Sequence, residues 1–461
     1  MKIKKLKLSN YRAFSTFECT FNHDLNVLVG LNGFGKTTIL DAIACAFGQF
    51  VAGFETGKDI GISDSDIRLS KNIVKADDGL FLQEDSTLFN MERQFPVVIS
   101  VESYQDEYNF PLNWSRTRKE LKGRTSQVKE LKEVAQALQD DVKKNTSVTL
   151  PLLGFYGTGR LWKQKRLTEG KNPANKKDSR LDGYQDCLDP ESSYSAFASW
   201  LRRETIADFE HRMKIAEYSG LEDAVVKGKT LRQGLLAAVN QAINVVLQPS
   251  GWSNVRYSAQ AKEVVASHKF QGDVPVSSLS DGVRNMIGMI ADIAYRAVKL
   301  NPHFGNEAVL KTSGIVLIDE VDMHLHPQWQ QFVLQNISEA FPKLQFFVTT
   351  HSPQVLTTVE SSKILILPDL SAGKTVALPP IGETLGKESS YVLTQTLSVS
   401  SRPPLPQVKI YQEYVELINS GLQNSKAAHE KRAELESIIG TGHEDLQKAD
   451  RLIKRRELLG K

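Results

Sequence analysis

The segment that most constrains this chain covers residues 30–37 and reads G-L-N-G-F-G-K-T. It matches the pattern G-x-x-x-x-G-K-[ST], in which a glycine-rich turn surrounds an anion with backbone N–H groups. The apolar run at residues 25–29 predicts a buried strand before the turn, and residues 38–47 predict a helix after it. This is the context that a phosphate-binding loop needs. The alternative, a glycine-rich turn that matches by chance, is disfavoured by both flanking elements.

The residues of this loop suggest which anion it holds. Gly30, Gly33 and Gly35 let the backbone turn tightly and approach a phosphate group closely. Lys36 would reach the β- and γ-phosphates of a nucleoside triphosphate, and the Thr37 hydroxyl would ligate Mg²⁺. The sequence therefore predicts a nucleotide site with a magnesium ion.

Two carboxylates stand where an apolar strand is predicted to end. Residues 315–318 are four apolar β-formers, and Asp319 and Glu320 follow directly. Asp319 can ligate Mg²⁺, and Glu320 can orient or deprotonate the attacking water. A pair that caps a helix after the strand is the structural alternative, but the order of the motifs along the chain favours the nucleotide site.

Histidines follow the acidic strand and the next apolar strand, residues 344–350. His351 stands at the end of this second strand, and its ring can hydrogen-bond the γ-phosphate. Together with Asp322, the histidines could instead form a metal site, but each has a place in the nucleotide interpretation, which we favour. The histidines concerned are His324, His326 and His351.

A second anion site is predicted before the apolar helix at residues 285–300. A serine and a glycine amide at the start of a helix favour anions, and Ser280 and Gly282 occupy such positions. Alone this pattern would be weak. It gains weight because the acidic strand and the histidine strand follow it in order.

Between these motifs lies a region, residues 116–144, with a single glycine and no proline. Six apolar residues in it follow a heptad spacing that is broken once, at Arg124. We expect a helix here, either an inserted arm or one amphipathic helix packed on its own domain. The six residues are Leu121, Val128, Leu131, Ala135, Leu138 and Val142.

A basic segment follows the strand predicted at residues 150–156. An aromatic residue, Trp162, lies among its lysines and arginines, a composition that suits nucleic-acid phosphates and bases. A solvated flexible loop without a ligand explains the same composition equally well. The basic residues are Arg160, Lys163, Lys165, Arg166, Lys171, Lys176, Lys177 and Arg180, against Glu169 and Asp178.

Composition excludes several classes of protein. The net charge is only +3, so nucleic-acid contacts must come from local patches. The three scattered cysteines give neither a zinc motif nor a disulfide framework, and no apolar run is long enough to span a membrane. The first residues lack the continuous apolar core of a signal peptide. We expect a cytoplasmic protein with no membrane contact.

This order of motifs resembles the ABC-type ATPase heads of the SMC and RecF class. Residues 10–14, N-Y-R-A-F, are similar to that class's N-terminal N-F-R-x-F segment, and Asn32 matches its form of the phosphate loop. Residues 278–282 resemble its L-S-G-G-Q signature, with Asp281 in place of the first glycine. The resemblance implies an α/β fold: an ABC-type P-loop ATPase head, with a mixed sheet flanked by helices, an inserted helical arm and a C-terminal helical tail.

The resemblance also implies ATP and Mg²⁺ as ligands, and an assembly of several chains. Two heads would pack head to tail, in a homodimer or a higher even oligomer, so that the signature of one chain contacts ATP held by another. Glu320 and His351 would be catalytic, and Thr37 and Asp319 would hold Mg²⁺. No glutamine loop can be assigned. The residues expected to bind ATP are Asn32, Gly33, Gly35, Lys36, Thr37, Thr38, Ser280 and Gly282.

The C-terminal part narrows the resemblance. Residues 386–393, G-K-E-S-S-Y-V-L, are similar to a segment of standalone bacterial ATPases of this class. Amphipathic helices are predicted at residues 411–418, 425–438 and 444–458, and no glycine–acid core of a TOPRIM nuclease is present. The chain is thus similar to the ATPase subunits of the Septu and retron anti-phage systems. That similarity implies a separate HNH nuclease as partner and nucleic acid as the target.

We expect four parts: an N-terminal ATPase lobe at residues 1–112, a helical insertion at 113–254, a C-terminal ATPase lobe at 255–380 and a helical tail at 381–461. The favoured function is an ATP-hydrolysing subunit that regulates a nuclease in defence against phage. Two rivals stay open: a DNA-repair ATPase like RecF that acts without a nuclease, and a sensor that binds ATP without hydrolysing it. A transporter ATPase is disfavoured by the N-terminal segment and the insertion.

Overall fold

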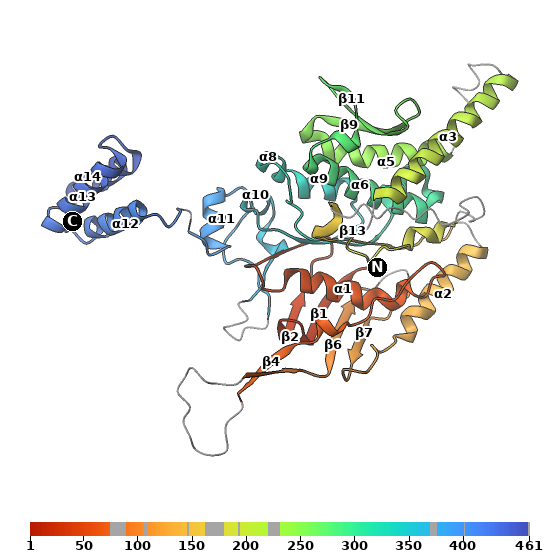
Figure 1. Ribbon diagram of the computed structural model, residues 1–461, viewed down its shortest axis with the longest axis horizontal. Coiled ribbons are helices and arrows are strands. Elements are labelled where there is room, and N and C mark those ends of the chain that lie inside the picture. Colours follow the sequence, from red (N-terminus) through yellow and green to blue (C-terminus); the bar gives the residue numbers. More distant parts are fainter. Residues whose placement is uncertain are drawn as a thin grey trace, which may run out of the picture. The chain divides into compact units, whose positions relative to one another are not determined.

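The computed structural model describes residues 1–73, 89–105, 108–144, 147–161, 179–191, 194–219, 231–368, 376–400 and 402–459. The chain forms two compact units, Met1–Leu397 and Ser398–Lys461. Figure 1 shows their helices and strands along the sequence. The division into four parts expected from the sequence stays a prediction.

A five-stranded parallel sheet forms the centre of the first unit. Its strand order is β14-β3-β13-β12-β8, and every neighbouring pair is parallel. All residues of β3, β8, β12 and β13 are buried, as expected for apolar strands covered on both faces. The order brings the carboxyl ends of β3, β13 and β12 together at one edge of the sheet. The strands are β3 (Leu25–Val29), β8 (Leu152–Tyr156), β12 (Gly314–Ile318), β13 (Leu344–Thr349) and β14 (Ile364–Ile366).

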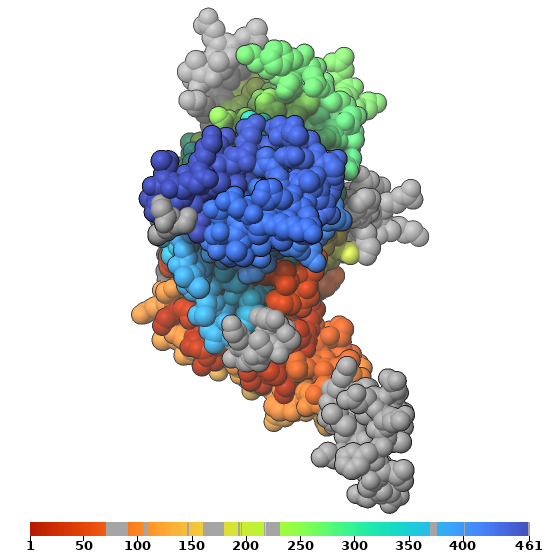
Figure 2. All heavy atoms as spheres, turned by 90° about the vertical axis from the view of Figure 1, so that its left-hand side faces the viewer, coloured from red at the N-terminus to blue at the C-terminus, as the bar shows by residue number. Residues whose placement is uncertain are grey.

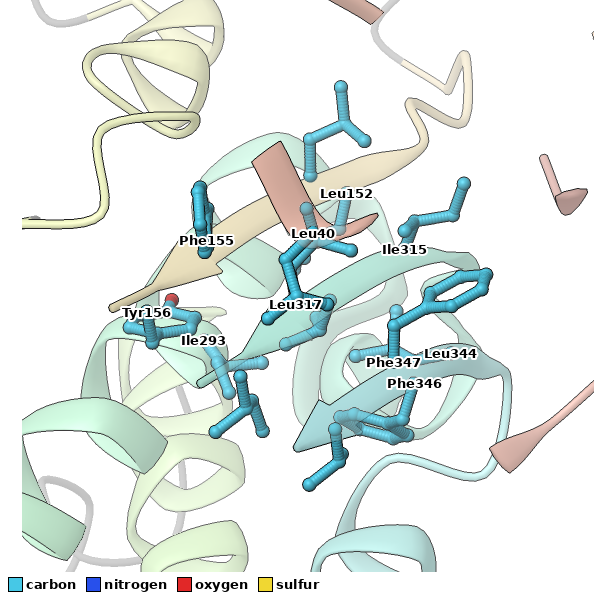
Figure 3. Close-up of a cluster of buried hydrophobic side chains, with 14 of the residues drawn as sticks. Leu40, Leu152, Phe155, Tyr156, Ile293, Ile315, Leu317, Leu344, Phe346 and Phe347 are labelled. Atoms are coloured by element: carbon cyan, nitrogen blue, oxygen red, sulfur yellow. The ribbon is translucent and has the colours of Figure 1, made fainter. Parts of the chain in front are cut away.

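Helices cover both faces of this sheet. Helix α1 (Lys36–Val51) lies on one side and α6 (Asp281–Leu300) on the other (Figure 1). Successive side chains of a strand point to opposite faces, so apolar strands meet both helices. Figure 3 shows the resulting core, in which Leu40 of α1 and Ile293 of α6 meet side chains of β8, β12 and β13. This core holds the strand ends, and the polar groups that follow them, in fixed positions.

A four-stranded antiparallel sheet with the order β2-β1-β6-β7 belongs to the same unit, and β6 and β7 pack on α1. A separate two-stranded ribbon, β4 paired with β5, lies between β2 and β6 in the sequence. The strands are β1 (Ile3–Tyr11), β2 (Phe14–Thr20), β4 (Leu69–Ile73), β5 (Phe89–Arg93), β6 (Val97–Ser103) and β7 (Asn113–Arg118).

The other long helices of the first unit gather around α6. Helices α3 (Tyr194–Ser219) and α5 (Leu231–Leu247) pack on α6, and α5 also packs on a three-stranded antiparallel sheet with the order β11-β10-β9. These strands are β9 (Trp252–Ser258), β10 (Glu263–His268) and β11 (Gly272–Pro275). The shorter helices are α7 (Ala308–Lys311), α8 (Pro327–Gln330), α9 (Val333–Ala340), α10 (Pro353–Leu356) and α11 (Ser389–Gln395).

The helix predicted from residue 116 begins later than expected. Residues 113–118 form β7, whose buried positions Trp114, Arg116 and Arg118 alternate as in a strand, and helix α2 (Lys129–Lys144) starts eleven residues after β7 ends. Arg116 is fully buried because Asp59 and backbone carbonyls accept its hydrogen bonds. A buried arginine resembles a surface residue in sequence, which concealed the strand. Helix α2 packs on α1, so it is an amphipathic helix of its own domain rather than a free arm.

The second unit consists of three helices, as the sequence predicted: α12 (Pro406–Asn419), α13 (Lys426–Ile439) and α14 (Glu444–Leu458). In the space-filling view of Figure 2, these helices form one closely packed body, coloured dark blue. The unit has a small core of its own, formed by Tyr414, Ile418, Ala428, Leu435, Leu446 and Ala449. Within the described residues of both units, no helix is long and apolar enough to cross a membrane.

Candidate nucleotide site

The phosphate loop connects β3 to α1, as the sequence predicted. Gly33 and Gly35 have φ angles of +84° and +88°, in the left-handed region that favours glycine. A Cβ atom at Gly35 would lie 2.5 Å from the ring of Phe14, so this position needs glycine for two reasons. Asn32 is exposed in the turn, and Thr38 is buried in the first turn of α1. The loop therefore has the tight backbone that a phosphate cradle requires.

Lys36, the first residue of α1, bends back over its own loop. Its Nζ atom donates hydrogen bonds to the carbonyl oxygens of Gly30 and Leu31, at 2.9 and 3.1 Å. Burial lowers the pKa of Lys36, and the negative charges of Asp319, Glu320 and Asp322 oppose that shift. The amino group thus lies within the field of the acidic residues that follow β12.

A chain of hydroxyl and carboxylate groups joins the loop to the two neighbouring strands. The Thr37 Oγ1 atom donates to Asp319 Oδ2 at 2.8 Å, and Thr349 Oγ1 donates to Asp319 Oδ1 at 2.6 Å. The backbone N–H of Glu320 donates to the same threonine hydroxyl at 2.7 Å. Oxygen atoms of a hydroxyl and a carboxylate side by side are the ligands that Mg²⁺ prefers. The residues at this point fit a magnesium ion.

Glu320 and His351 lie at the ends of adjacent strands. Glu320 has a φ angle of +48°, unusual for a residue other than glycine, and such backbones recur at functional sites. Burial lowers the pKa of His351, and the charge of Lys36 lowers it further, whereas Asp322, Glu320 and Asp319 oppose the shift. These electrostatic contacts place His351 in the same cluster as Lys36 and the acidic residues.

Asp322 has a partner of its own in this cluster. The Thr350 Oγ1 atom donates to Asp322 Oδ1 at 2.5 Å, and the N–H of Ser352 donates to Thr350 Oγ1 at 3.0 Å. The ring of His326 caps α8, where its Nδ1 atom accepts from the N–H of Gln328 at 3.3 Å. Within the described ranges, no group of three or more His, Cys, Asp or Glu side chains has an arrangement that could hold a metal ion.

The second predicted anion site lies at the start of α6. Ser280 is exposed at the N-cap position of α6, and its side chain makes no capping hydrogen bond. Gly282 is buried, and a Cβ atom there would lie 2.3 Å from the carbonyl oxygen of His324. Gly282 therefore has a role within its own chain, because it lets α6 pack on the segment after the acidic strand. Neither residue hydrogen-bonds the phosphate loop of the same chain in the part of the structure that is described.

One residue near the loop was missed as a functional candidate. Arg12, in the N-Y-R-A-F segment, donates to Asp41 Oδ2 at 2.5 Å and to Asp66 Oδ1 at 2.7 Å. Burial opposes its charge, but Asp41 and Asp66 outweigh burial and raise the pKa of Arg12. Asp41 lies one helical turn after Thr37 and therefore on the same side of α1. An acidic residue at this spacing from the phosphate loop was the sequence signal that could have indicated a basic partner such as Arg12. The segment thereby holds a permanent positive charge close to the start of α1.

Most of the basic segment predicted to contact nucleic acid, including Trp162 and Lys163 to Lys177, lies outside the described residues. Arg180 is described, and its guanidinium donates to the backbone carbonyls of Leu300 and Val148 at 2.5–2.9 Å. Arg180 therefore binds the end of α6 within its own chain, and nucleic-acid contact by the basic segment stays a prediction.

Comparison with known proteins agrees with this geometry. The family described as AAA ATPase domain matches residues 1–356. The retron Vc95 probable ATPase of Vibrio cholerae serotype O1 biovar El Tor is 27% identical over 464 residues, which cover 93% of this chain and 86% of the relative. The Septu protein PtuA of Bacillus thuringiensis is 23% identical over 372 residues, which cover 79% of this chain and 75% of PtuA.

A solved SMC head, bound to the C-winged helix domain of ScpA, aligns with 79% of this chain and 94% of its own length, at 15% identity and a TM-score of 0.43. The similarity to a retron ATPase and to PtuA confirms the resemblance predicted from the sequence. Since the family match covers the phosphate loop, the acidic strand and the histidine strand, the chain belongs to the AAA ATPase domain family.

Proposed function

We propose that this chain binds and hydrolyses ATP as a subunit of an anti-phage defence assembly. The observation that carries the proposal is the meeting of Lys36, Thr37, Asp319, Glu320 and His351 at one edge of the parallel sheet. Membership of an ATPase family supports the nucleotide, and the similarity to a retron ATPase and to PtuA supports the biological role.

Each residue of the cluster has a chemical part in the proposed reaction. Lys36 would leave its loop carbonyls and bind the β- and γ-phosphate oxygens, while the amides of the loop cradle the remaining phosphates. Thr37 and Asp319 would hold Mg²⁺, which neutralises charge on the phosphates when bound. Glu320 would orient or deprotonate the attacking water, and a neutral His351 would hydrogen-bond the γ-phosphate.

The turnover of ATP tests the assignment of Glu320. We expect Glu320→Gln to bind ATP as the wild type does and to hydrolyse it at least about a hundredfold more slowly, because the general base contributes about 10²–10⁴ in rate. Glu339→Gln, an exposed position on α9, is the matched control and should hydrolyse ATP normally. Wild-type turnover by Glu320→Gln contradicts the assignment. If neither the wild type nor Glu320→Gln hydrolyses ATP above background, the result favours a sensor that binds ATP without hydrolysing it.

We further propose that two copies close head to tail over ATP. The exposed Ser280 at the start of α6 supports this, since a helix N-terminus favours phosphate oxygens of a neighbouring site. Light scattering should show an ATP-dependent dimer, or a larger even assembly, for Glu320→Gln, and Ser280→Arg in that background should abolish it. The same substitution at Ser437, exposed on α13, is the control. A dimer that still forms in the Ser280→Arg variant would show that the start of α6 is not part of the dimer interface.

For the defence role we propose an HNH enzyme as the partner and nucleic acid as its target. Plating efficiency of phage on cells that carry the gene with its chromosomal neighbours tests the role. Protection should disappear in Lys36→Ala and persist in Lys58→Ala, an exposed lysine outside the cluster. Protection without a neighbouring nuclease, or protection by Lys36→Ala, would contradict the proposal. A repair defect in place of phage sensitivity would favour the RecF-like alternative.

A further inference from the structure

Helix α14 of the C-terminal unit carries charges on two faces. Two of its acidic residues pair with the rest of the unit: both guanidinium Nη atoms of Arg402 donate to Asp445, at 2.7 and 2.9 Å, and Arg432 donates to Asp450 at 2.6 Å. These ion pairs join α14 to the preceding segment and to α13. Two negative charges of the helix are thereby neutralised on its inner side. A third acidic residue, Glu444, pairs with Lys448 of the same helix at 2.7 Å.

The outer face of α14 is basic. Arg451, Lys454 and Arg455 are exposed, and no ion pair holds any of them within the part of the chain that the structure describes. Arg451 and Arg455 are four residues apart, so they lie on the same face of the helix. Lys448, one turn before Arg451, is neutralised by Glu444 and is not part of this unpaired group. Glu457, the remaining unpaired acidic residue, is two residues beyond Arg455, which places it about 200° around the helix.

The stability of the helix by itself does not explain why this face is basic. Basic residues in a last turn interact favourably with the helix dipole, which accounts for Arg455 but not for Arg451 in the preceding turn. Like charges four residues apart on a helix destabilise it. The inner ion pairs and the small core already hold α14 in place. An external anion is the simplest reason for the outer charges.

We propose that the outer face of α14 binds the phosphate backbone of a nucleic acid. The rise of about 1.5 Å per residue puts Arg451 and Arg455 about 6 Å apart along the helix, and the major groove of a duplex is wide enough to admit an α-helix. A short turn with Gly440 at φ +81° separates α13 from α14. The basic face therefore belongs to a separate helix rather than to a continuation of α13.

A nucleic acid explains these features better than an acidic protein. The basic side chains follow one face at helical spacing, which suits a regular row of phosphates. The inference is independent of the nucleotide site, because all of its residues belong to the second unit. Loss of nucleic-acid binding and loss of ATP turnover are therefore separable results.

Fluorescence anisotropy of the full chain with a labelled duplex of about 30 base pairs, at several salt concentrations, tests the proposal. In the variant Arg451→Gln/Lys454→Gln/Arg455→Gln, the Kd at about 50 mM salt should rise at least about tenfold. The slope of log K against log salt should shrink by about 2.7, since each lost phosphate contact removes about 0.9. Basal ATP turnover should stay at the wild-type value.

Two controls separate local contacts from folding and from net charge. Arg451→Lys/Arg455→Lys keeps the charges and should keep the salt slope. Lys409→Gln/Lys426→Gln removes exposed charges from α12 and α13 and should leave the slope unchanged. An unchanged slope in the triple variant overturns the proposal. So does binding of poly-glutamate that is as tight as that of DNA and equally dependent on these three residues, which would assign the face to an acidic protein.

Discussion

In the first unit the charged groups gather at one edge of a buried parallel sheet, whereas in the second unit they lie between and outside three helices. The sheet edge is fixed by fully buried strands, and hydrogen bonds connect Thr37, Asp319 and Thr349 there. Among the described residues of the C-terminal unit, the core contains six buried apolar residues, and the ion pairs Arg402–Asp445 and Arg432–Asp450 hold α14 to the preceding segment and to α13. Where a large apolar core stabilises the fold, polar groups are free to bind ligands. In a small unit, some charged groups are needed to stabilise the fold itself.

The two units can be observed separately. All five tryptophans, at positions 114, 162, 200, 252 and 329, belong to the first unit. Tryptophan fluorescence therefore reports the unfolding of the first unit, and helical circular dichroism reports both. The four predictions below use this difference.

The largest effect is expected at Arg116, the buried arginine of β7. Its Nη atoms donate to Asp59 at 2.8 and 3.0 Å and to the carbonyls of Cys45 and Ile60 at 2.9 Å. Arg116→Ala removes all of these bonds, and loss of one partner of a buried pair costs about 3–5 kcal/mol. Urea denaturation followed by tryptophan fluorescence should show this loss. Lys119→Ala, at an exposed position just after β7, should leave the transition unchanged, and an equally stable Arg116→Ala would contradict the account of β7.

The next effect concerns the small core of the C-terminal unit. Leu435 is fully buried there, and Leu→Ala in a core costs about 2–5 kcal/mol. Leu435→Ala should therefore unfold a helical component seen by circular dichroism, with no shift in the tryptophan transition. Leu422→Ala, at a leucine that is 51% exposed, is the matched control. A parallel shift of both signals would show that the units unfold as one.

A smaller effect is expected where α6 meets the acidic segment. The Cβ atom of Gly282→Ala would lie 2.3 Å from the His324 carbonyl oxygen, and such overpacking costs about 1–3 kcal/mol. Gly288→Ala lies in the same helix with its nearest atom at 3.7 Å, so it should be neutral or stabilising by up to about 1 kcal/mol. If the two variants unfold at the same denaturant concentration, as followed by tryptophan fluorescence, the packing role of Gly282 is contradicted.

The smallest effect is the pH dependence from His351. Its pKa is lowered from 6.5, so the unfolded chain binds the proton at a higher pH than the folded chain does. The free energy of unfolding should therefore fall as the pH drops below about 6.5, and His351→Gln should lose part of that dependence. Denaturation followed by tryptophan fluorescence at pH 7.5 and pH 5.5 compares the two. An identical pH dependence in the wild type and His351→Gln would contradict the lowered pKa of His351.

The sequence predicted the nucleotide-site elements well because their signals are local. A buried apolar run before Gly30, and another before Asp319, define strands, and the motif residues follow at fixed spacing. Where long-range contacts decide the structure, prediction failed. Arg116 looked like a helix surface residue, since its partner Asp59 is remote in sequence, and Arg12 gave no sign of its contact with Asp66.

Gly282 illustrates the same limit within a correctly recognised motif. Its place in the signature predicted contact with a nucleotide on another chain, which stays a prediction. Gly282 also packs against the carbonyl of His324, about 40 residues later in the chain, where the backbone turns with φ +62°. No local sequence pattern predicts that contact. Sequence motifs thus located the chemistry, while the supporting contacts needed the fold.

The central claim is that Lys36 and the acidic strand hold the phosphates of a magnesium nucleotide. Calorimetric titration of Mg·ATP into the wild type, Lys36→Ala and Lys58→Ala tests it most directly. The account predicts saturable binding by the wild type and by Lys58→Ala, and loss of binding by a folded Lys36→Ala. Binding of Mg·ATP by Lys36→Ala with the wild-type affinity would contradict it.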